Sequence, residues 1–173
     1  MSEIFISHLK TPLGLMSAIC DKDGLLRLDW TQAPLSQQVD IKTENDVSRE
    51  TITQLSDYLK GARHHFTLTL SPAAASPSLL AWMNAIAQIP YGETASYKEL
   101  ATLWGNEKAS RAAGNACQRN PIPIIVPCHR IIGSTGSFDR YSGGNRTTPT
   151  DPKNIARKKA LLDLEAGLIM PLM

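Results

Sequence analysis

Residues 71–76 divide the chain into two parts of different character. This segment, Ser-Pro-Ala-Ala-Ala-Ser, consists of small residues, and Pro72 within it and Pro77 after it both interrupt regular backbone hydrogen bonding. Before it, short apolar runs alternate with turn sequences, and after it apolar residues recur at helical spacing. The break predicts a mixed α+β chain with an α/β domain at residues 1–76 and a largely helical domain at residues 77–173.

The first part predicts strands at residues 4–8, 13–20 and 25–30, because these runs are apolar or alternating and are separated by the turn sequences Thr-Pro-Leu-Gly and Asp-Lys-Asp-Gly. Residues 33–45 are polar and predict a loop. Residues 46–60 predict a helix that Gly61 ends. The alternating sequence Phe-Thr-Leu-Thr-Leu predicts a further strand at residues 66–70.

The second part predicts helices joined by short turns. Ser76 can cap a helix with Pro77 at its first position, and Pro90 stops that helix after residue 89. Ser96 and Glu99 have the spacing of a capping box, which opens a helix that ends before Gly105. A second helix follows over residues 107–118, so the two form a helix-turn-helix pattern. Helical hairpins of this kind also occur in proteins that bind no nucleic acid.

The second of these helices carries almost no bulky side chains. Its small residues are Ala109, Ala112, Ala113, Gly114 and Ala116. Such a helix can pack closely against another helix, or it can bring its backbone close to a ligand. The residues of the helix alone leave both interpretations open.

Composition excludes several classes of protein. Among 173 residues, 42% are apolar and 20% are charged, which is typical of a globular chain rather than a disordered one. No apolar run approaches the roughly 18 residues of a membrane span, and the N-terminus has no signal pattern. Three widely spaced cysteines imply no disulfide framework. We therefore expect a soluble protein in a reducing compartment.

Charge is unevenly distributed along the chain. Residues 1–76 hold 7 Lys and Arg against 9 Asp and Glu, and residues 77–173 hold 11 against 7, so the net charges are −2 and +4. This excess fits a nucleic-acid-binding second half, although it is also what an ordinary solvated face would show.

The sequence Asn-Pro-Ile-Pro-Ile-Ile-Val-Pro-Cys-His-Arg at residues 120–130 indicates chemistry. Residues 124–126 predict a short buried strand, and Pro127 ends it just before Cys128. Only the thiolate of a cysteine is nucleophilic, and we expect His129 and Arg130 to lower the pKa of Cys128 from its ordinary value of about 8.5. The alternative is an inert buried cysteine, which we prefer for Cys20 on its apolar strand.

Adjacent side chains of an extended chain point to opposite sides. We therefore expect His129 to act as a base on Cys128 through a turn or a bridging water. Such a base needs a carboxylate to orient it, and Glu165, near the end of the helix that Pro152 would start, is one candidate among several.

The sequence Pro-Cys-His-Arg, preceded by Asn-Pro-Ile-Pro and followed by Ile-Ile-Gly and Tyr-Ser-Gly-Gly, resembles the O6-alkylguanine-DNA alkyltransferases, also called methylated-DNA–protein-cysteine methyltransferases. The resemblance is specific over residues 90–144 and looser through the last helix. Residues 1–76 show no motif but are compatible with the family's variable domain. The resemblance implies a small ribonuclease-H-like domain followed by a winged-helix-type domain.

The resemblance also implies a mechanism of direct DNA repair. Cys128 would take the alkyl group from O6 of guanine, and also from O4 of thymine, in one irreversible turnover. His129 would act as the water-mediated base, Glu165 would hold its other nitrogen, Asn120 would brace the turn, and Tyr97 would donate its hydroxyl to guanine N3. No cofactor and no catalytic metal are implied, and the spacing of the scattered histidines and Cys20 predicts no zinc site.

A further set of residues would bind the DNA or form the base pocket. Arg111 would fill the space of an extruded nucleotide, although it could also be a phosphate-binding or solvated arginine. The other expected DNA-binding residues are Ser96, Ala112, Ala113, Gly114 and Arg119. The expected pocket residues are Cys117, Pro123, Ile131, Asp139, Tyr141 and Ser142, with the amide of Ser142 donating to O6 and the carbonyls of Cys128 and Ile131 accepting from the exocyclic amine.

The implied partner is double-stranded DNA that contains O6-alkylguanine, with no membrane. We expect a monomer in the cytoplasm, or in the nucleus of a eukaryote. The resemblance implies that the second helix of the helix-turn-helix pattern enters the minor groove of the DNA. Small side chains would let its backbone fit there, because the groove is only about 6 Å wide.

Three features depart from the family pattern. The connection at residues 145–155 is longer than usual, and the assignment of Glu165 depends on how the last helix docks. Asp139 replaces a small residue in the pocket loop. Cys117 replaces a larger apolar residue, and we interpret it as a packing residue.

Two other classes of function compete with this interpretation. The chain could be a module that binds damaged DNA without transferring the alkyl group, with Cys128 unused. A cysteine hydrolase is disfavoured because Cys128 and His129 are adjacent and no oxyanion-hole pattern is recognisable.

Overall fold

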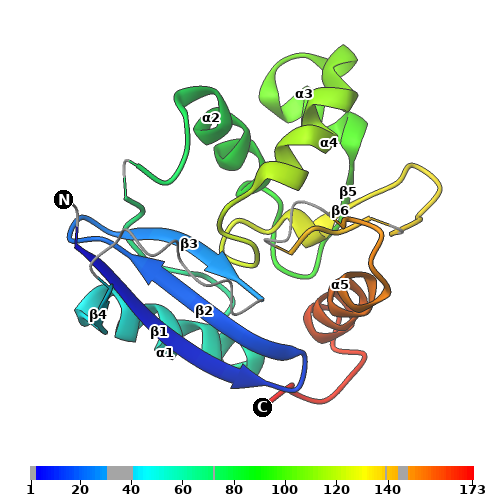
Figure 1. Ribbon diagram of the computed structural model, residues 1–173. Helices are drawn as coiled ribbons and strands as arrows, with labels where there is room; N and C mark the ends of the chain where they lie inside the picture. Colours follow the sequence, from blue (N-terminus) through cyan, green and yellow to red (C-terminus); the bar gives the residue numbers. More distant parts are fainter. Residues whose placement is uncertain (1–2, 31–40, 72, 139, 144–147) are drawn as a thin grey trace. The chain divides into compact units, whose positions relative to one another are not determined.

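The computed structural model describes residues 3–30, 41–71, 73–138, 140–143 and 148–173. The chain forms two compact units, one of Met1–Ala75 with Pro171–Met173 and one of Ser76–Met170 (Figure 1). The division into domains at residues 1–76 and 77–173 stays a prediction, and the last three residues cluster with the first unit rather than the second.

The first unit is built on a sheet with the strand order β3-β2-β1-β4. The hairpin neighbours β1 (Ile4–Thr11), β2 (Gly14–Cys20) and β3 (Leu25–Asp29) pair antiparallel, which confirms the three predicted strands. The fourth strand, β4 (Ile41–Thr43), pairs parallel with β1 and lies inside the predicted loop of residues 33–45.

Helix α1 (Asp46–Leu59) packs on this sheet and confirms the predicted helix (Figure 1). Its inward residues recur every three to four positions, and Leu55 and Tyr58 are fully buried with Met16 and Leu28 of the sheet. Cys20 belongs to this core, where burial raises its pKa to about 12. It is therefore protonated at neutral pH, as expected of an inert thiol.

The predicted strand at residues 66–70 is wrong. Only Leu70 pairs, in a single bridge with Leu25. The side chain of Gln54 takes the place of a partner strand, because its Oε1 accepts from the amide of Thr67 and its Nε2 donates to the Thr67 hydroxyl, each at 2.9 Å. An alternating pattern cannot reveal this competition from a side-chain amide.

The second unit contains most of the predicted helices. Its elements are α2 (Pro77–Ile86), β5 (Ala95–Ser96), α3 (Tyr97–Trp104), the 3-10 helix η1 (Glu107–Ala109), α4 (Ser110–Arg119), the 3-10 helix η2 (Cys128–Arg130), β6 (Ile131–Ile132) and α5 (Pro152–Glu165). β5 and β6 pair parallel, and α3 packs on α4 (Figure 1). In the described part of the chain, no helix is long and apolar enough to cross a membrane.

The capping predictions for this unit are confirmed. The Ser76 hydroxyl accepts from the amide of Leu79 at 3.3 Å, and Pro77 is the first residue of α2. The Ser96 hydroxyl accepts from the Glu99 amide at 3.2 Å, while the Glu99 carboxylate accepts from the Ser96 amide at 2.6 Å. This capping box fixes where α3 begins, directly at Tyr97.

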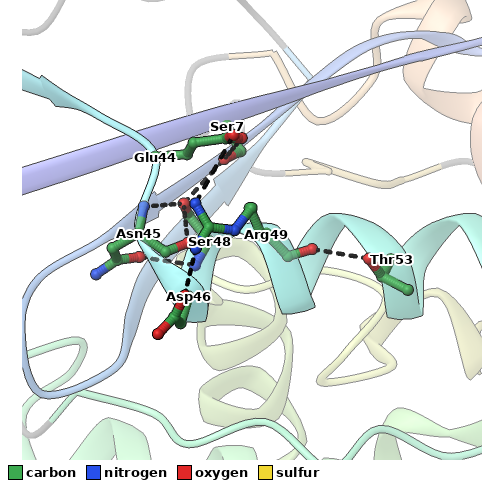
Figure 2. A network of polar contacts seen from close by, with 7 residues as sticks. All are labelled: Ser7, Glu44, Asn45, Asp46, Ser48, Arg49 and Thr53. Atoms are coloured by element: carbon green, nitrogen blue, oxygen red, sulfur yellow. Dashed lines mark hydrogen bonds and ion pairs between the residues drawn. The ribbon is translucent and has the colours of Figure 1, made fainter.

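A polar network holds the start of α1 against the sheet (Figure 2). Asn45 caps the helix by accepting from the amide of Ser48 at 2.8 Å. The hydroxyl of Ser48 accepts from the amide of Asn45 at 3.0 Å and from the hydroxyl of Ser7 on β1 at 2.8 Å. Glu44 accepts from the Ser7 hydroxyl and pairs with Arg49. The cap therefore joins the helix terminus to the sheet.

We expect Asn45→Ala to lower the free energy of unfolding by about 1 kcal/mol, because the amide of Ser48 loses its acceptor. Thr53→Ala is the matched control on the same helix, since Thr53 is exposed and its hydroxyl donates only to the carbonyl of Arg49 among its described contacts. The control should change the free energy of unfolding by less than about 0.5 kcal/mol. Urea unfolding followed by circular dichroism measures both, and equal effects would contradict the capping role.

Candidate active site

Cys128 opens a single turn of 3-10 helix, η2, directly after Pro127. Its amide donates to the carbonyl of Val126 at 2.8 Å, and the amide of Arg130 donates to the carbonyl of Pro127 at 2.9 Å. All three side chains of η2 are buried. Since successive residues of a 3-10 helix point about 120° apart, Cys128 and His129 leave this turn in different directions.

The predicted strand at residues 124–126 is wrong, because this segment is a turn. Ile124 has a φ of 74°, a left-handed conformation that a β-branched residue rarely adopts. The side chain of Asn120 stabilises the turn from within. Its Nδ2 donates to the carbonyl of Val126 at 2.8 Å, and its Oδ1 accepts from the amide of Ile122 at 3.0 Å.

The same Asn120 amide also reaches the thiol. Its Nδ2 lies 3.1 Å from the Sγ of Cys128, and both residues are buried. Asn120 thus connects the turn to the sulfur. The contacts agree with the bracing position that the resemblance implied for it, and its part in catalysis stays a prediction.

The pKa of Cys128 is raised by burial, which disfavours the thiolate. The Asn120 hydrogen bond and the positive charge of Lys158 oppose this effect and lower the pKa in part. The prediction that His129 and Arg130 lower the pKa of this thiol is therefore wrong. The side chains of His129 and Arg130 contact a carboxylate instead of the thiol.

That group is the carboxylate of Glu165, in the last turn of α5. Its Oε1 lies 2.8 Å from the Nε2 of His129, and its Oε2 accepts from the Nε of Arg130 at 2.8 Å. The Nη2 of Arg130 adds a bond to Oε1 at 3.0 Å, and the amide of Gly92 adds one to Oε2 at 3.2 Å. The Glu165 side chain is only 1% exposed, so these bonds replace its water.

His129 is held as a neutral imidazole. Burial lowers its pKa, although the Glu165 hydrogen bond and charge raise it in part. Because a carboxylate only accepts, Nε2 carries the proton in this contact and Nδ1 carries the lone pair. A neutral imidazole in this tautomer can accept a proton at Nδ1.

Sequence reasoning missed the role of Arg130 as the main partner of Glu165. Its Nη1 also donates to the carbonyl of Ile89 at 2.6 Å, and its guanidinium lies 5.7 Å from the ring centroid of Tyr91. The sequence contained an indication of this role, because Arg130 follows an apolar segment that is expected to be buried, and a buried arginine requires a carboxylate partner.

Sequence reasoning also missed Lys158. It lies in the middle of α5 and is 1% exposed. Its Nζ donates to the carbonyls of Ile131 at 2.5 Å and Arg140 at 3.1 Å. The available signal was its spacing of seven residues from Glu165, which places both on one face of the helix.

A cavity of about 480 Å³ opens beside Cys128. Its lining residues come from α3, α4, η2 and the segment that follows β6: Tyr97, Ser110, Arg111, Gly114, Asn115, Cys117, Gln118, Cys128, Arg140, Tyr141, Ser142 and Pro149. Of the expected pocket residues, Cys117, Tyr141 and Ser142 thus meet at one cavity.

Two of the other expected pocket residues are not among the lining residues of this cavity. They are Pro123 and Ile131, which are both buried, and their place in the base pocket stays a prediction. The carbonyl of Ile131 accepts from Lys158. Asp139 lies outside the described residues, as does the start of the long connection at residues 145–155.

Cys117 is the second thiol of the cavity. It is half-buried on α4, and burial raises its pKa, so it is protonated at neutral pH. Among the described residues, no group of three His, Cys, Asp or Glu side chains is placed to hold a metal ion.

The expected DNA-binding residues of the helix-turn-helix pattern differ in how far they are exposed. Arg111, Ala112 and Arg119 are exposed on α4. Ala113 is fully buried, so the expectation that it contacts DNA is corrected: its methyl group packs inside the unit. Gly114 faces the cavity, where a Cβ would lie 3.9 Å from the ring of Tyr97.

Two protein-family models match the chain in succession. One is described as the 6-O-methylguanine DNA methyltransferase, ribonuclease-like domain, and it matches residues 4–72. The other is described as the 6-O-methylguanine DNA methyltransferase, DNA binding domain, and it matches residues 80–167. The predicted fold class, a ribonuclease-like unit followed by a helical DNA-binding unit, is confirmed.

Whole proteins with established names are similar over most of their length. The methylated-DNA–protein-cysteine methyltransferase of Methanosarcina acetivorans is 38% identical over 143 residues, which are 82% of this chain and 91% of the relative. The constitutive enzyme of that name from Bacillus subtilis is 35% identical over 158 residues, or 88% of this chain and 95% of the relative.

A crystal structure of Mycobacterium tuberculosis OGT in complex with DNA superposes with a TM-score of 0.79 and 31% identity, covering 96% of this chain and 95% of that one. Both family models, the named relatives and this structure point to one family. The chain therefore belongs to the methylated-DNA–protein-cysteine methyltransferase family.

Proposed function

We propose that this protein repairs DNA by direct reversal, moving the alkyl group of O6-alkylguanine onto the sulfur of Cys128 in a single turnover. One observation carries the proposal. The Cys128 thiol lines a cavity large enough for a small ligand, while Asn120 contacts the sulfur and the neighbouring His129 is a neutral base oriented by Glu165.

The reaction begins with the proton of the thiol. Because its pKa is raised, Cys128 rests as a thiol at neutral pH and must be deprotonated before it attacks. A water molecule can relay this proton to the Nδ1 of His129, since the two side chains leave η2 in different directions. The carboxylate of Glu165 then stabilises the imidazolium that forms.

In the transfer step, a bond forms between Sγ and the alkyl carbon as the bond from that carbon to O6 breaks. The electron pair of the broken bond stays on the guanine. Tyr97 and Ser142 both line the cavity, so the hydroxyl of Tyr97 can donate a proton to N3 and the amide of Ser142 can donate to O6. The proton that His129 took from the thiol returns through water to the Tyr97 oxygen, so the net change converts a thiol and O6-alkylguanine into a thioether and guanine.

The base must leave the duplex to reach the sulfur, at a cost of a few kcal/mol. Arg111 is exposed at the start of α4 and also lines the cavity, which suits a side chain that occupies the space of the extruded nucleotide. The exposed Ala112 and half-buried Gly114 leave α4 narrow on this face. A narrow helix fits the minor groove, where sequence is read only weakly.

The reaction consumes one protein molecule for each alkyl group, because a thioether is a very poor leaving group and does not regenerate the thiol.

DNA is the partner that the matched DNA-binding domain supports. A monomer and transfer from O4-alkylthymine stay predictions. We place the protein in the cytoplasm, where the DNA of its bacterial and archaeal relatives lies.

We expect wild-type protein to gain one methyl group per chain when it is incubated with a duplex containing O6-methylguanine. Cys128→Ala should gain none, because the accepting sulfur is absent, and should still bind the duplex within about threefold of wild type, a change of less than 1 kcal/mol. Intact-mass spectrometry and a gel-shift titration measure the two properties.

Cys20→Ala is the matched control, because Cys20 is a buried thiol of the first unit and does not line the cavity. It should gain the methyl group as wild type does. A methyl gain by Cys128→Ala would contradict the proposal, and the absence of any gain by wild type would favour a module that only binds damaged DNA.

We expect Glu165→Gln to slow single-turnover methyl transfer by about 100-fold, the lower end of what a general base contributes. Without the carboxylate the pKa of His129 falls further, so the imidazole becomes a weaker base at every pH. The uncompensated charge of Arg130 should also destabilise the fold by about 3 kcal/mol. Rapid-quench kinetics and thermal unfolding measure the two effects.

Asp163→Asn controls for loss of a carboxylate from the same helix, since Asp163 pairs with Lys159 rather than with the site. Its transfer rate should stay within about twofold of wild type, because surface pairs of this kind are weak. Equal slowing by both substitutions would point to a general effect on α5 instead of an action through His129.

A further inference from the structure

The charged residues that line the cavity beside Cys128 are all cations. Of its lining residues, which all belong to the described part of the chain, Arg111 comes from α4 and Arg140 from the segment that follows β6, and none is Asp or Glu. The two thiols of the cavity, Cys117 and Cys128, are neutral at rest because burial raises their pKa. The cavity wall therefore attracts an anionic ligand more strongly than a neutral one.

Both guanidinium groups are available to such a ligand. Arg111 and Arg140 are exposed, and within the described residues neither guanidinium has an ion pair or a hydrogen bond. The side chains that lower the pKa of Cys128 are Asn120 and Lys158. The two cavity arginines are not among them, so their charges are available to a ligand rather than to the sulfur.

Arg140 is the one of the two that stays in the cavity during the reaction. In the proposed mechanism Arg111 fills the space of the extruded nucleotide, so its charge is in the duplex when the base is in the cavity. Arg140 lies outside the helix-turn-helix pattern, two residues before Ser142, whose amide is proposed to donate to O6. The long, flexible stem of an arginine lets its charge reach a group attached to O6 from there.

A carboxylate on the alkyl group is an anion that this charge would serve. Attack on such a group brings two negative charges together, the thiolate of Cys128 and the carboxylate, and their repulsion slows the transfer. The planar guanidinium of Arg140 can bind both carboxylate oxygens and offset that repulsion. When the base fills the cavity it displaces water, so this pair is screened less than an ordinary surface pair.

The cavity also has room for such a group. Its volume of about 480 Å³ lies in the range that holds drug-sized ligands, which are larger than a methylated base.

We propose that Arg140 is a specificity-determining residue, which binds the carboxylate of O6-alkyl groups that end in one, so that O6-carboxymethylguanine is preferred over its neutral analogues. The proposal rests on the proposed function and names a substrate class for the same cavity. In the transfer step the Sγ of Cys128 bonds to the methylene carbon as the bond from that carbon to O6 breaks. The guanine keeps the electron pair of that bond and receives the proton of the thiol, and the product is S-carboxymethylcysteine.

The test compares two lesions of nearly equal size that differ in charge. One duplex carries O6-carboxymethylguanine and the other, at the same position, O6-carbamoylmethylguanine, in which a neutral amide replaces the carboxylate. Single-turnover rates of transfer to Cys128 are measured by mass spectrometry. The ratio of the two rates is compared between proteins, because the intrinsic reactivity of each lesion then cancels.

In Arg140→Gln the ratio of the carboxymethyl rate to the carbamoylmethyl rate should fall about tenfold, the loss expected for a hydrogen bond between charged groups. Arg140→Lys keeps a positive charge but lacks the planar fork that binds two oxygens. It should therefore give a ratio between those of wild type and Arg140→Gln.

Arg119→Gln is the matched control, because Arg119 is an exposed arginine of α4 that does not line the cavity. As an expected DNA-binding residue it should affect both duplexes alike and leave the ratio within about twofold of that of wild type. Asp139→Asn is the second control, since Asp139 precedes Arg140 and lies outside the described residues. Removing that carboxylate leaves the charge of Arg140 in place, so the ratio should stay the same or rise.

An unchanged ratio in Arg140→Gln would overturn the proposal. An equal fall of both rates would overturn it as well, because that result assigns Arg140 to a phosphate of the DNA, the other anion within its reach. A ratio that falls as far in Asp139→Asn as in Arg140→Gln would also contradict it, since the preference would then not follow the charge.

Binding measured without transfer separates this proposal from the proposed function. In protein that carries Cys128→Ala, the ratio of the affinities for the two duplexes should also fall about tenfold when Arg140→Gln is added. Fluorescence anisotropy measures these affinities. If wild type transfers no alkyl group from either lesion or from O6-methylguanine, the proposed function fails, while the affinity ratios still decide whether Arg140 binds the carboxylate.

Discussion

The buried carboxylate of Glu165 connects three segments that are far apart in the sequence. It accepts hydrogen bonds from Arg130 and from the amide of Gly92, and it orients His129. Removing a carboxylate from water costs several kcal/mol unless paired donors surround it, so these segments must come together before Glu165 can be buried. Because Cys128 lies in the same helical turn as His129 and Arg130, the place of the reacting sulfur depends on this interaction.

The last helix is therefore a scaffold for chemistry more than a support for an apolar core. Asn154 donates to the carbonyl of Thr148 at 3.2 Å, Lys158 to those of Ile131 and Arg140, and Glu165 receives the donors of η2. Each contact ties a short element or a connecting segment to α5. A row of polar side chains on one helix can thus hold the part of the cavity wall that lies outside α3 and α4.

The sequence was informative where side-chain identity decides the structure. The caps at Ser76 and Ser96 could be predicted because a hydroxyl before a helix has one evident use, and Glu165 could be named because a basic histidine requires a carboxylate. The failures occurred where a side chain binds backbone atoms, which leave no pattern. Gln54 replaces a strand partner at residue 67, and Asn120 turns residues 120–127 into a loop that places Ile124 at a φ of 74°. The two carbonyl acceptors of Lys158 were invisible for the same reason.

A thiol with a raised pKa is at first sight a poor choice for a nucleophile, but it suits a protein that can react only once. A thiolate also reacts with oxidants and stray electrophiles, and alkylation or oxidation to the sulfonic acid would consume the molecule irreversibly. Burial keeps Cys128 protonated at rest, while Asn120 and Lys158 keep the cost of deprotonation within reach of a neutral His129. A base that enters the cavity would exclude water from the sulfur, and in that drier surrounding the fixed dipole of Asn120 and the charge of Lys158 act more strongly on the developing thiolate. Reactivity would then be greatest when a nucleobase fills the site, which is the moment at which the single turnover is useful.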